Sequence, residues 1–184
     1  MNFFHVCFLL FISPEFYLVD GTDPLCDLIA ATNLRDLGLN WGCNLGLMLG
    51  PHCVWDGISC SSTEEVTSID LPYQRPFLTG TLPSSLVKLT KMTHLNVARN
   101  NLNGTVPATF GYLDKLATMD LSNNKFSGTI PTSFGKLSSI TTLVLKANKF
   151  NGTIPTSLGS LETISSLYLD HACLHGTIPS SLSL

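Results

Sequence analysis

The sequence predicts a solenoid, an elongated coil in which short repeating units stack on one another. The first observation is a strict period of 24 residues in the motif G-T-[LVI]-P, which opens at Gly80, Gly104, Gly128, Gly152 and Gly176. The second is that long stretches recur at this period, since NKFSGTIPTSFGKL (124–137) returns as NKFNGTIPTSLGSL (148–161). The third is that apolar residues keep fixed places in every unit, as a shared core requires.

One repeat is too small to fold by itself. The repeat at 140–163 has seven apolar positions, which are Ile140, Leu143, Leu145, Phe150, Ile154, Leu158 and Leu161. Burying each of these side chains contributes roughly 1.5–3 kcal/mol, whereas fixing the backbone costs roughly 1–2 kcal/mol for every residue of the repeat. Neighbouring coils must therefore share their apolar faces, and only the stack is stable.

Each part of the repeat has an expected role. The stretch ITTLVL (140–145) predicts a short strand with Leu143 and Leu145 on one face. Asn100, Asn124 and Asn148 occupy the same place just after the strand. Because an amide side chain both donates and accepts hydrogen bonds, we expect them to form a ladder that satisfies backbone groups of adjacent coils.

The pattern L-x-x-L-x-L-x-x-N-x-L resembles that of leucine-rich repeats, and the continuation through G-T-I-P is similar to the plant-type extracellular class. The similarity covers residues 66–184. It implies a right-handed coil of about five 24-residue repeats, with a concave parallel β-sheet and a convex side of short 3-10 and β segments. The sequence departs from the pattern at PYQRPF (72–77), which adds two residues and removes the ladder Asn of the first repeat. Ala172 replaces the ladder Asn of the fifth repeat, and no C-terminal cap follows it.

Residues 22–65 are expected to cap the front of the solenoid, whose core would otherwise meet water. Asp23 is suited to cap a helix that begins at Pro24. Leu25, Leu28 and Ile29 form a short apolar stripe on that helix, and Gly38 is placed to end it.

Apart from Cys7, which lies in the apolar stretch at the N-terminus, four cysteines precede the repeats: Cys26, Cys43, Cys53 and Cys60. In an exported protein they predict two disulfides, with three possible connectivities. The alternative of a zinc site is disfavoured because no C-x-x-C pair occurs. The stretch HCVWDGISC (52–60) resembles the N-terminal cap element of the same extracellular families. That resemblance implies a Cys53–Cys60 disulfide, a Cys26–Cys43 disulfide, and packing of Trp55 on the first coil.

Residues 1–21 have the character of a signal peptide, with an apolar centre from Phe3 to Ile12. The alternative interpretation is a buried strand of an intracellular domain. No other apolar run approaches the roughly 20 residues of a transmembrane helix. We therefore expect a secreted protein of the extracellular space, the cell wall or the cell surface. Two N-x-[ST] sequons, at Asn103 and Asn151, predict glycosylation.

The sequence carries none of the common catalytic motifs. It lacks G-x-S-x-G, H-E-x-x-H, the phosphate-binding G-x-x-x-x-G-K-[ST] and the dinucleotide-binding G-x-G-x-x-G. We expect no enzyme activity, no cofactor and no metal. Charged residues make up only 12% of the chain and the net charge is −3, so no nucleic-acid partner is predicted either.

The variable positions lie between the core leucines of each predicted strand, on the face that the resemblance makes concave. We expect this face to bind a protein or peptide, because Tyr and Arg are common in binding hot spots. The candidate residues are Tyr73, His94, Arg99, Asp120, Lys146, Tyr168, Asp170 and His171. The alternative interpretation is that these solvent positions vary without function.

Two functions remain open on the sequence. The first is a receptor-like or co-receptor ectodomain that binds a peptide or a receptor, since the predicted length resembles that of the somatic embryogenesis receptor kinase ectodomains. The second is a secreted inhibitor of a cell-wall-degrading glycosidase, similar to polygalacturonase-inhibiting proteins, which have about twice as many coils. The uncapped C-terminal end, where Cys173 is unpaired, predicts either self-association or a longer protein whose chain continues beyond Leu184.

Overall fold

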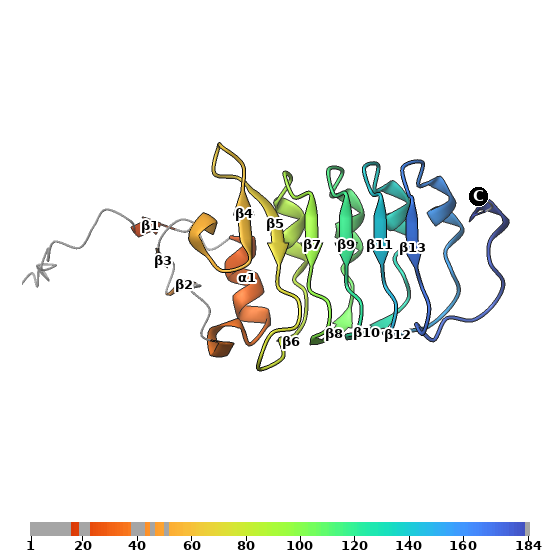
Figure 1. Ribbon diagram of the computed structural model, residues 1–184, viewed down its shortest axis with the longest axis horizontal. Coiled ribbons are helices and arrows are strands. Elements are labelled where there is room, and N and C mark those ends of the chain that lie inside the picture. Colours follow the sequence, from red (N-terminus) through yellow and green to blue (C-terminus); the bar gives the residue numbers. More distant parts are fainter. Residues whose placement is uncertain (1–15, 19–22, 38–42, 45–46, 50–51, 183–184) are drawn as a thin grey trace, which may run out of the picture.

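The computed structural model describes residues 16–18, 23–37, 43–44, 47–49 and 52–182. The chain forms a solenoid in which successive strands lie side by side along the long axis, with 3-10 helices behind them (Figure 1). The predicted class of fold is confirmed, with a parallel sheet on one side, 3-10 turns on the other and one α-helix near the front.

The large sheet positions the candidate site. Its strand order is β13-β11-β9-β7-β5-β4, and all neighbours are parallel except β4 and β5, which are antiparallel. The strands are β4 (Ile58–Cys60), β5 (Val66–Asp70), β7 (His94–Asn96), β9 (Thr118–Asp120), β11 (Thr142–Val144) and β13 (Ser166–Tyr168). Residues that are equivalent in the repeat are direct partners across this sheet, so each repeat position becomes a column.

The return path of each coil contains a second strand and a 3-10 helix. The smaller sheet consists of β6 (Thr79–Gly80), β8 (Asn101–Thr105), β10 (Lys125–Gly128) and β12 (Lys149–Phe150), all parallel. The 3-10 helices behind them are η3 (Ser84–Lys88), η4 (Ala108–Tyr112), η5 (Thr132–Lys136), η6 (Thr156–Ser160) and η7 (Ser180–Leu182). Each of the first four follows a proline with extended backbone, which fixes where the chain turns into the helix.

Two kinds of glycine keep the coils in register. Gly104 of the G-T-x-P motif has a φ of +77°, a conformation that residues with a Cβ rarely adopt. Gly135, in η5, allows the next coil to approach closely, since a Cβ there would lie 2.2 Å from the Ser157 carbonyl oxygen. The second role recurs at Gly111 and Gly159, and the sequence analysis did not identify it.

The core lies between the large sheet and the 3-10 helices. Leu143, Leu145 and Phe150 of the repeat at 140–163 are fully buried. Phenylalanines fill the centre of several coils, and Phe110, Phe126 and Phe134 are also without exposed surface. One continuous cluster runs from the helix of the cap to the last coil, which explains why no single repeat needs its own core.

The buried asparagines form the ladder. Asn124 donates from Nδ2 to the carbonyls of Val97, Leu121 and Ser122, at 2.9, 3.2 and 3.2 Å. Its Oδ1 accepts from the backbone N–H of Leu102 at 3.0 Å. One side chain thus forms hydrogen bonds with backbone groups of its own turn and of the preceding coil, and Asn100 and Asn148 do the same.

The front of the solenoid is covered by α1 (Pro24–Ala31), whose buried face is Leu25, Leu28 and Ile29. Asp23 caps it, with Oδ1 accepting from the N–H groups of Leu25 and Cys26.

The prediction that this helix continues to Gly38 is wrong. The helix ends at Ala31 because Asn33 leaves it to pair with the smaller sheet, accepting from the Thr79 N–H at 2.7 Å. A separate 3-10 helix, η1 (Leu34–Leu37), follows.

A three-stranded antiparallel sheet precedes the large one in the chain. It contains β1 (Phe16–Leu18), β3 (Leu47–Leu49) and β2 (Cys43–Asn44), in that order. Strand β1 lies within the predicted signal peptide, so cleavage after residue 21 would remove it and leave the β2–β3 hairpin.

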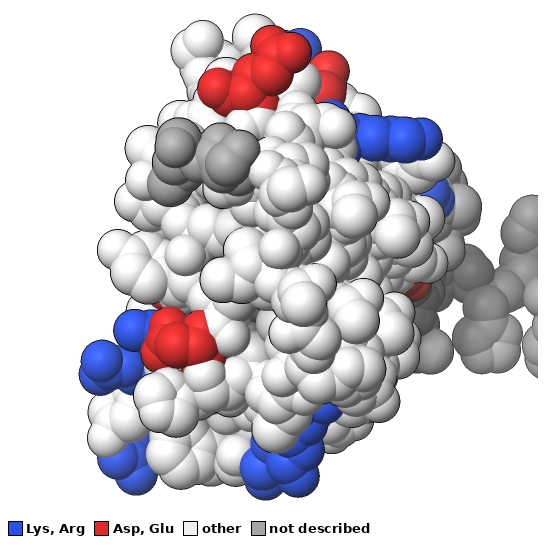
Figure 2. Space-filling model, turned by 90° about the vertical axis from the view of Figure 1, so that its right-hand side faces the viewer, with Lys and Arg blue, Asp and Glu red and all other residues white. Residues whose placement is uncertain are grey.

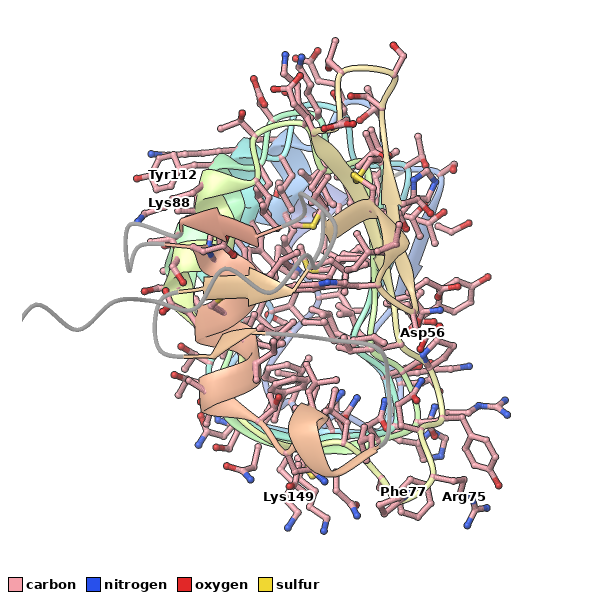
Figure 3. The ribbon with its side chains drawn as sticks, turned by 90° about the vertical axis from the view of Figure 1, so that its left-hand side faces the viewer. Asp56, Arg75, Phe77, Lys88, Tyr112 and Lys149 are labelled. Carbon is pink, nitrogen blue, oxygen red and sulfur yellow. A yellow bond between two sulfur atoms is a disulfide. The ribbon has the colours of Figure 1, made fainter. Side chains whose placement is uncertain are left out.

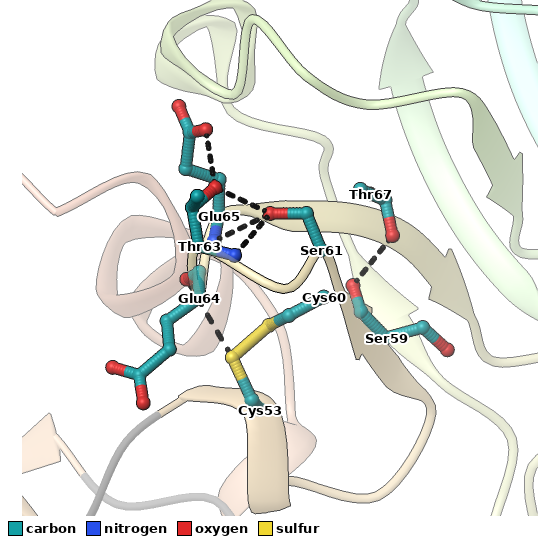
Figure 4. The surroundings of a disulfide bond; sticks show 8 residues. All are labelled: Cys53, Ser59, Cys60, Ser61, Thr63, Glu64, Glu65 and Thr67. Carbon is teal, nitrogen blue, oxygen red and sulfur yellow. Dashed lines mark hydrogen bonds between the residues drawn. A yellow bond between two sulfur atoms is a disulfide. The ribbon is translucent and has the colours of Figure 1, made fainter.

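A disulfide joins Cys53 of η2 (His52–Val54) to Cys60 of β4 (Figure 4). The Cys53 sulfur also lies 3.5 Å from the Glu64 carbonyl. Cys26 is disulfide-bonded as well; the side chain of Cys43, its predicted partner, lies outside the described part of the structure. Trp55 belongs to the core cluster and is 2% exposed.

The C-terminal end of the solenoid is open. Ile164, Leu167 and Leu169 are only partly buried, whereas their equivalents one coil earlier have no exposed surface. Together with Ile178 and Leu182 they line a hollow of about 400 Å³. Figure 2 shows this end, where uncharged surface fills the middle and charged side chains lie along the rim. Cys173, on the same coil, is exposed and has a free thiol.

Candidate functional site

The candidate site lies on the open face of the large sheet, which we define as the side of β5, β7, β9, β11 and β13 that faces away from the core. In β9, Met119 points into the core while Thr118 and Asp120 point out, as the alternation of a strand requires. The first column on this face is Asp70, Asn96, Asp120, Val144 and Tyr168. Two members of this column, Asp120 and Tyr168, are among the predicted binding residues.

A shallow hollow of about 490 Å³ occupies the C-terminal half of this face. Its floor is made of small side chains, which are Ala98, Ser122, Val144 and Ala147. Polar and charged side chains surround the floor, and six of the eight predicted residues are among them: Arg99, Asp120, Lys146, Tyr168, Asp170 and His171. The structure therefore places these six at one concavity, with small residues leaving room for a ligand.

The charged groups of the hollow are arranged in pairs. Lys146 Nζ lies 5.5 Å from the centroid of the Tyr168 ring, within range of a cation–π interaction. His171 Nδ1 lies 3.1 Å from a carboxylate oxygen of Asp170. This hydrogen bond, aided by the charge of Lys146, holds the pKa of Asp170 below its usual value. The carboxylate remains ionised over the physiological pH range and available to a cationic ligand group.

Backbone conformation sets the direction of the outermost side chains. Arg99 and His171 both have positive φ, at 58° and 54°, as does Tyr73 at 50°. At a residue with positive φ the backbone is no longer extended, and these residues stand where the chain turns from the large sheet toward the smaller sheet. The residue that follows each of them, Asn100 after Arg99 and Ala172 after His171, is buried.

The carboxylate of Asp120 also forms a hydrogen bond within the fold. Its Oδ1 accepts from the Ser122 N–H at 2.9 Å, which stabilises the turn after β9. Asn96 uses its Oδ1 in the same way for Ala98, and its Nδ2 donates to Asp70 at 2.8 Å. The first three members of the column, Asp70, Asn96 and Asp120, are thus polar groups engaged in hydrogen bonds within the fold, and Asp120 also lines the hollow.

Two of the predicted residues lie outside the hollow. His94 is on the same face, but at the start of β7, where its Nδ1 is 2.7 Å from the Thr93 hydroxyl. Tyr73 lies on the loop 72–77 and stacks with Arg75 and Phe77, with ring centroids of Tyr73 and Phe77 5.9 Å apart. Figure 3 shows Arg75 and Phe77 at the lower edge of the molecule, below Asp56.

The sequence pointed to Tyr73 of this loop as a candidate binding residue but not to its cluster with Arg75 and Phe77. Arg75 lies over both aromatic rings, at 4.5 Å from the Tyr73 centroid and 4.8 Å from that of Phe77. The alternation of aromatic and basic residues in PYQRPF was the available signal. Such a cluster is an exposed, preorganised surface, but it is separate from the hollow.

No group of three metal-ligating side chains is found among the described residues. In the same part of the chain no helix has the length and apolar character needed to cross a membrane. The predicted glycosylation residues Asn103 and Asn151 are exposed, and they lie in and beside the smaller sheet rather than on the open face.

Models of the leucine-rich repeat match residues 91–113 and 114–174. A chain of the BIR3–SERK2 complex from Arabidopsis thaliana is 31% identical, with a TM-score of 0.77, over 89% of this chain and 87% of that one. The chain belongs to the leucine-rich repeat proteins of the plant extracellular type.

Two further structures of plant ectodomains are also similar to this chain. The BIR2 ectodomain from Arabidopsis thaliana is 29% identical, with a TM-score of 0.77, over 90% of this chain and 87% of that one. The ectodomain of the receptor kinase GASSHO1/SCHENGEN3, solved in complex with CASPARIAN STRIP INTEGRITY FACTOR 2, is 33% identical with a TM-score of 0.67. That match covers 71% of this chain but 16% of the receptor. A search of curated protein sequences found no significant match.

Proposed function

We propose that this leucine-rich repeat protein is a non-catalytic, extracellular recognition module that binds a peptide or a receptor through the open face of its large sheet. The hollow at residues Arg99, Lys146, Tyr168 and Asp170 is the observation that carries the proposal. It combines a small-residue floor with an exposed aromatic ring and charges of both signs, which suits the side chains of an extended peptide or a receptor loop.

The similar structures support this class of partner. They include the BIR3–SERK2 complex, in which two proteins are bound to each other, and the receptor HAESA in complex with the peptide hormone IDA and the co-receptor SERK1. The second of these is 29% identical to this chain, with a TM-score of 0.51. A disulfide in the cap and a predicted signal peptide are both typical of an extracellular protein.

The first test is to identify the partner. The protein is immobilised and exposed to plant extracellular fluid, and captured proteins are identified by mass spectrometry. A receptor or a secreted peptide as the main captured species supports the proposal. A cell-wall-degrading glycosidase would instead support the inhibitor function that the sequence left open.

The second test locates the binding face. Truncating a buried anchor typically lowers affinity by about 2 kcal/mol or more, or roughly thirtyfold. We expect this loss for Arg99→Ala and Tyr168→Ala in a titration against the captured partner. Lys125→Ala is the matched control, because Lys125 is exposed in β10 of the smaller sheet. If both open-face variants bind like the wild type, the partner binds elsewhere.

The apolar surface of the last described coil supports, as a second proposal, association of this coil with another copy of the chain. Its hollow is lined by aliphatic side chains, and Ile178 is 76% exposed. Strand β13 also pairs with β11 on one side alone within the described sheet. Sedimentation across a range of concentrations tests this proposal: a monomer at high concentration excludes it, and a dimer that Ile178→Ser dissociates supports it.

A further inference from the structure

A second surface lies on the opposite side of the molecule from the hollow. It is a groove of about 380 Å³ between the ends of the 3-10 helices and the turns that lead to the next strands. We call it the lysine–tyrosine groove, and it comprises Lys88, Lys91, Tyr112, Lys115 and Lys136. Lys88 is the last residue of η3, one repeat before Tyr112, and is included for that reason.

The repeat places these residues in two columns. Lys88, Tyr112 and Lys136 are the last residues of η3, η4 and η5, so they hold the same position in three consecutive coils. Lys91 and Lys115 form the second column, in the turns that follow. Since strands in adjacent coils are about 4.8 Å apart, the cations follow the solenoid axis at short, regular intervals.

Tyr112 is at the centre of this arrangement. Its side chain is 60% exposed, more than those of Tyr73 and Tyr168, whereas the phenylalanine rings at the centres of the coils are buried. Lys136 Nζ lies 4.8 Å from the ring centroid and 3.4 Å from the hydroxyl, to which it donates. Figure 3 shows Tyr112 and Lys88 on the 3-10 side of the coil, with Lys149 at a different edge.

The local charge is opposite to that of the whole chain. Three lysines, Lys91, Lys115 and Lys136, line the groove itself together with the carboxylate of Asp114, and Glu65 pairs with Lys91 at 3.7 Å. Three of the ten basic residues are therefore gathered here in a chain of net charge −3. An excess of cations at one groove attracts an anionic ligand, which the chain as a whole would repel.

We propose that the lysine–tyrosine groove binds an acidic polysaccharide, a polyuronate chain that carries one carboxylate on each sugar. A linear polymer of this kind can present successive carboxylates to lysines on successive coils. The apolar face of a sugar ring can pack on the exposed ring of Tyr112, while its hydroxyls contact Thr90 and Asp114 at the edge of the groove.

Other anionic partners fit the groove less well. An anionic membrane is bound by surfaces that combine lysines with several apolar side chains able to insert, and the groove has one aromatic ring and no aliphatic side chain among its lining residues. A protein interface needs an apolar core, which the same lining does not supply. Single-stranded nucleic acid is held by several stacking rings, whereas this groove offers one.

The test is a titration of the full chain with fluorescently labelled oligogalacturonate at low ionic strength. We expect binding that weakens as salt is added, because exposed charges are screened within about 10 Å at 0.1 M salt. Lys115→Ala and Lys136→Ala should each lower affinity by about fivefold, the usual contribution of one cation near an anionic surface. Tyr112→Ala should lower it further, and Tyr112→Phe should retain most of the binding.

The controls distinguish this site from general charge effects. Lys125→Ala and Lys149→Ala remove exposed lysines of the smaller sheet and should leave the affinity unchanged. Fully methyl-esterified oligogalacturonate, which has lost its charges, should not bind. Equal losses in the control variants, equal binding of the methyl ester, or equal binding of a DNA oligonucleotide or of anionic vesicles would overturn the proposal.

Discussion

The three ladder asparagines are chemically equivalent in the sequence, but the structure predicts that replacing them with Ala has unequal costs. When Asn124 is replaced, the carbonyls of Val97 and Leu121 keep the amides of Asn100 and Asn148, and Ser122 keeps the Arg99 N–H. Among the described groups, only the Leu102 N–H then loses its acceptor.

Asn100 and Asn148 are the two ends of the ladder, so more of the backbone groups that they bind have no second hydrogen-bond partner. Asn148→Ala removes the acceptor of the Phe126 N–H and the donor to the Leu145 carbonyl, because Ala172 supplies no amide from the next coil. Asn100→Ala affects three backbone groups, which are the N–H groups of Gln74 and Leu78 and the carbonyl of Leu71.

A buried polar group left without a partner costs roughly 1–3 kcal/mol. We therefore expect Asn124→Ala to lower the free energy of unfolding by about 2 kcal/mol, with Asn148→Ala costing about 4 kcal/mol and Asn100→Ala at least as much. Gln74 is only partly buried, so water can satisfy some of the loss at Asn100.

Urea denaturation followed by far-ultraviolet circular dichroism measures these differences in protein produced without glycans. Asn103→Ala is the matched control, because this asparagine is exposed in β8 and its replacement should change stability by less than about 0.5 kcal/mol. Equal costs at the three ladder positions, or a largest cost at Asn124, would refute the hydrogen-bond argument.

Three further predictions concern the core, the hollow and the sequons. Leu143→Ala should lower the free energy of unfolding by roughly 2–5 kcal/mol, and Leu167→Ala, one coil later and partly exposed, by clearly less in the same denaturation assay. His171→Ala should raise the pKa of the Asp170 carboxyl, measured by NMR titration, because the hydrogen bond that favours the ionised form is lost; an unchanged pKa would contradict this. Since that pKa is lowered in the folded protein, the stabilising effect of the pair is present at neutral pH and is lost as the pH falls through it. In protein secreted from eukaryotic cells, enzymatic deglycosylation should lower the mass by up to two glycans, and Asn-to-Gln changes at both sequons should abolish the shift.

The hydrophobic repeat was sufficient to predict the class of fold. A 24-residue period with fixed apolar positions permits few arrangements other than a stack of coils, because each unit lacks the apolar surface to fold alone. The same period predicted the register of the large sheet, since equivalent residues of stacked coils must be neighbours. The first column of the open face, from Asp70 to Tyr168, follows directly from this.

The departures from the repeat were not predictable in the same way. The length of α1 depends on Asn33, which leaves the helix to bond with Thr79, 46 residues away. The stacking of Arg75 with Tyr73 and Phe77 depends on the path of a loop that has no equivalent in the other coils. No local pattern relates Asn33 to Thr79, and the alternation of residues in the loop 72–77 does not fix the path of the loop, so neither set of contacts can be read from spacing.

The sequence by itself determined which residues face the solvent on each strand, because the repeat fixes both the alternation and the stacking. Only the tertiary structure decided which of them act together. Six of the eight predicted binding residues surround one hollow, while Tyr73 and His94 lie apart from it. The physical reason is that a hollow depends on the volumes of neighbouring side chains across several coils. At Ala98, Ser122 and Ala147 the side chains happen to be small together, which no single repeat reveals.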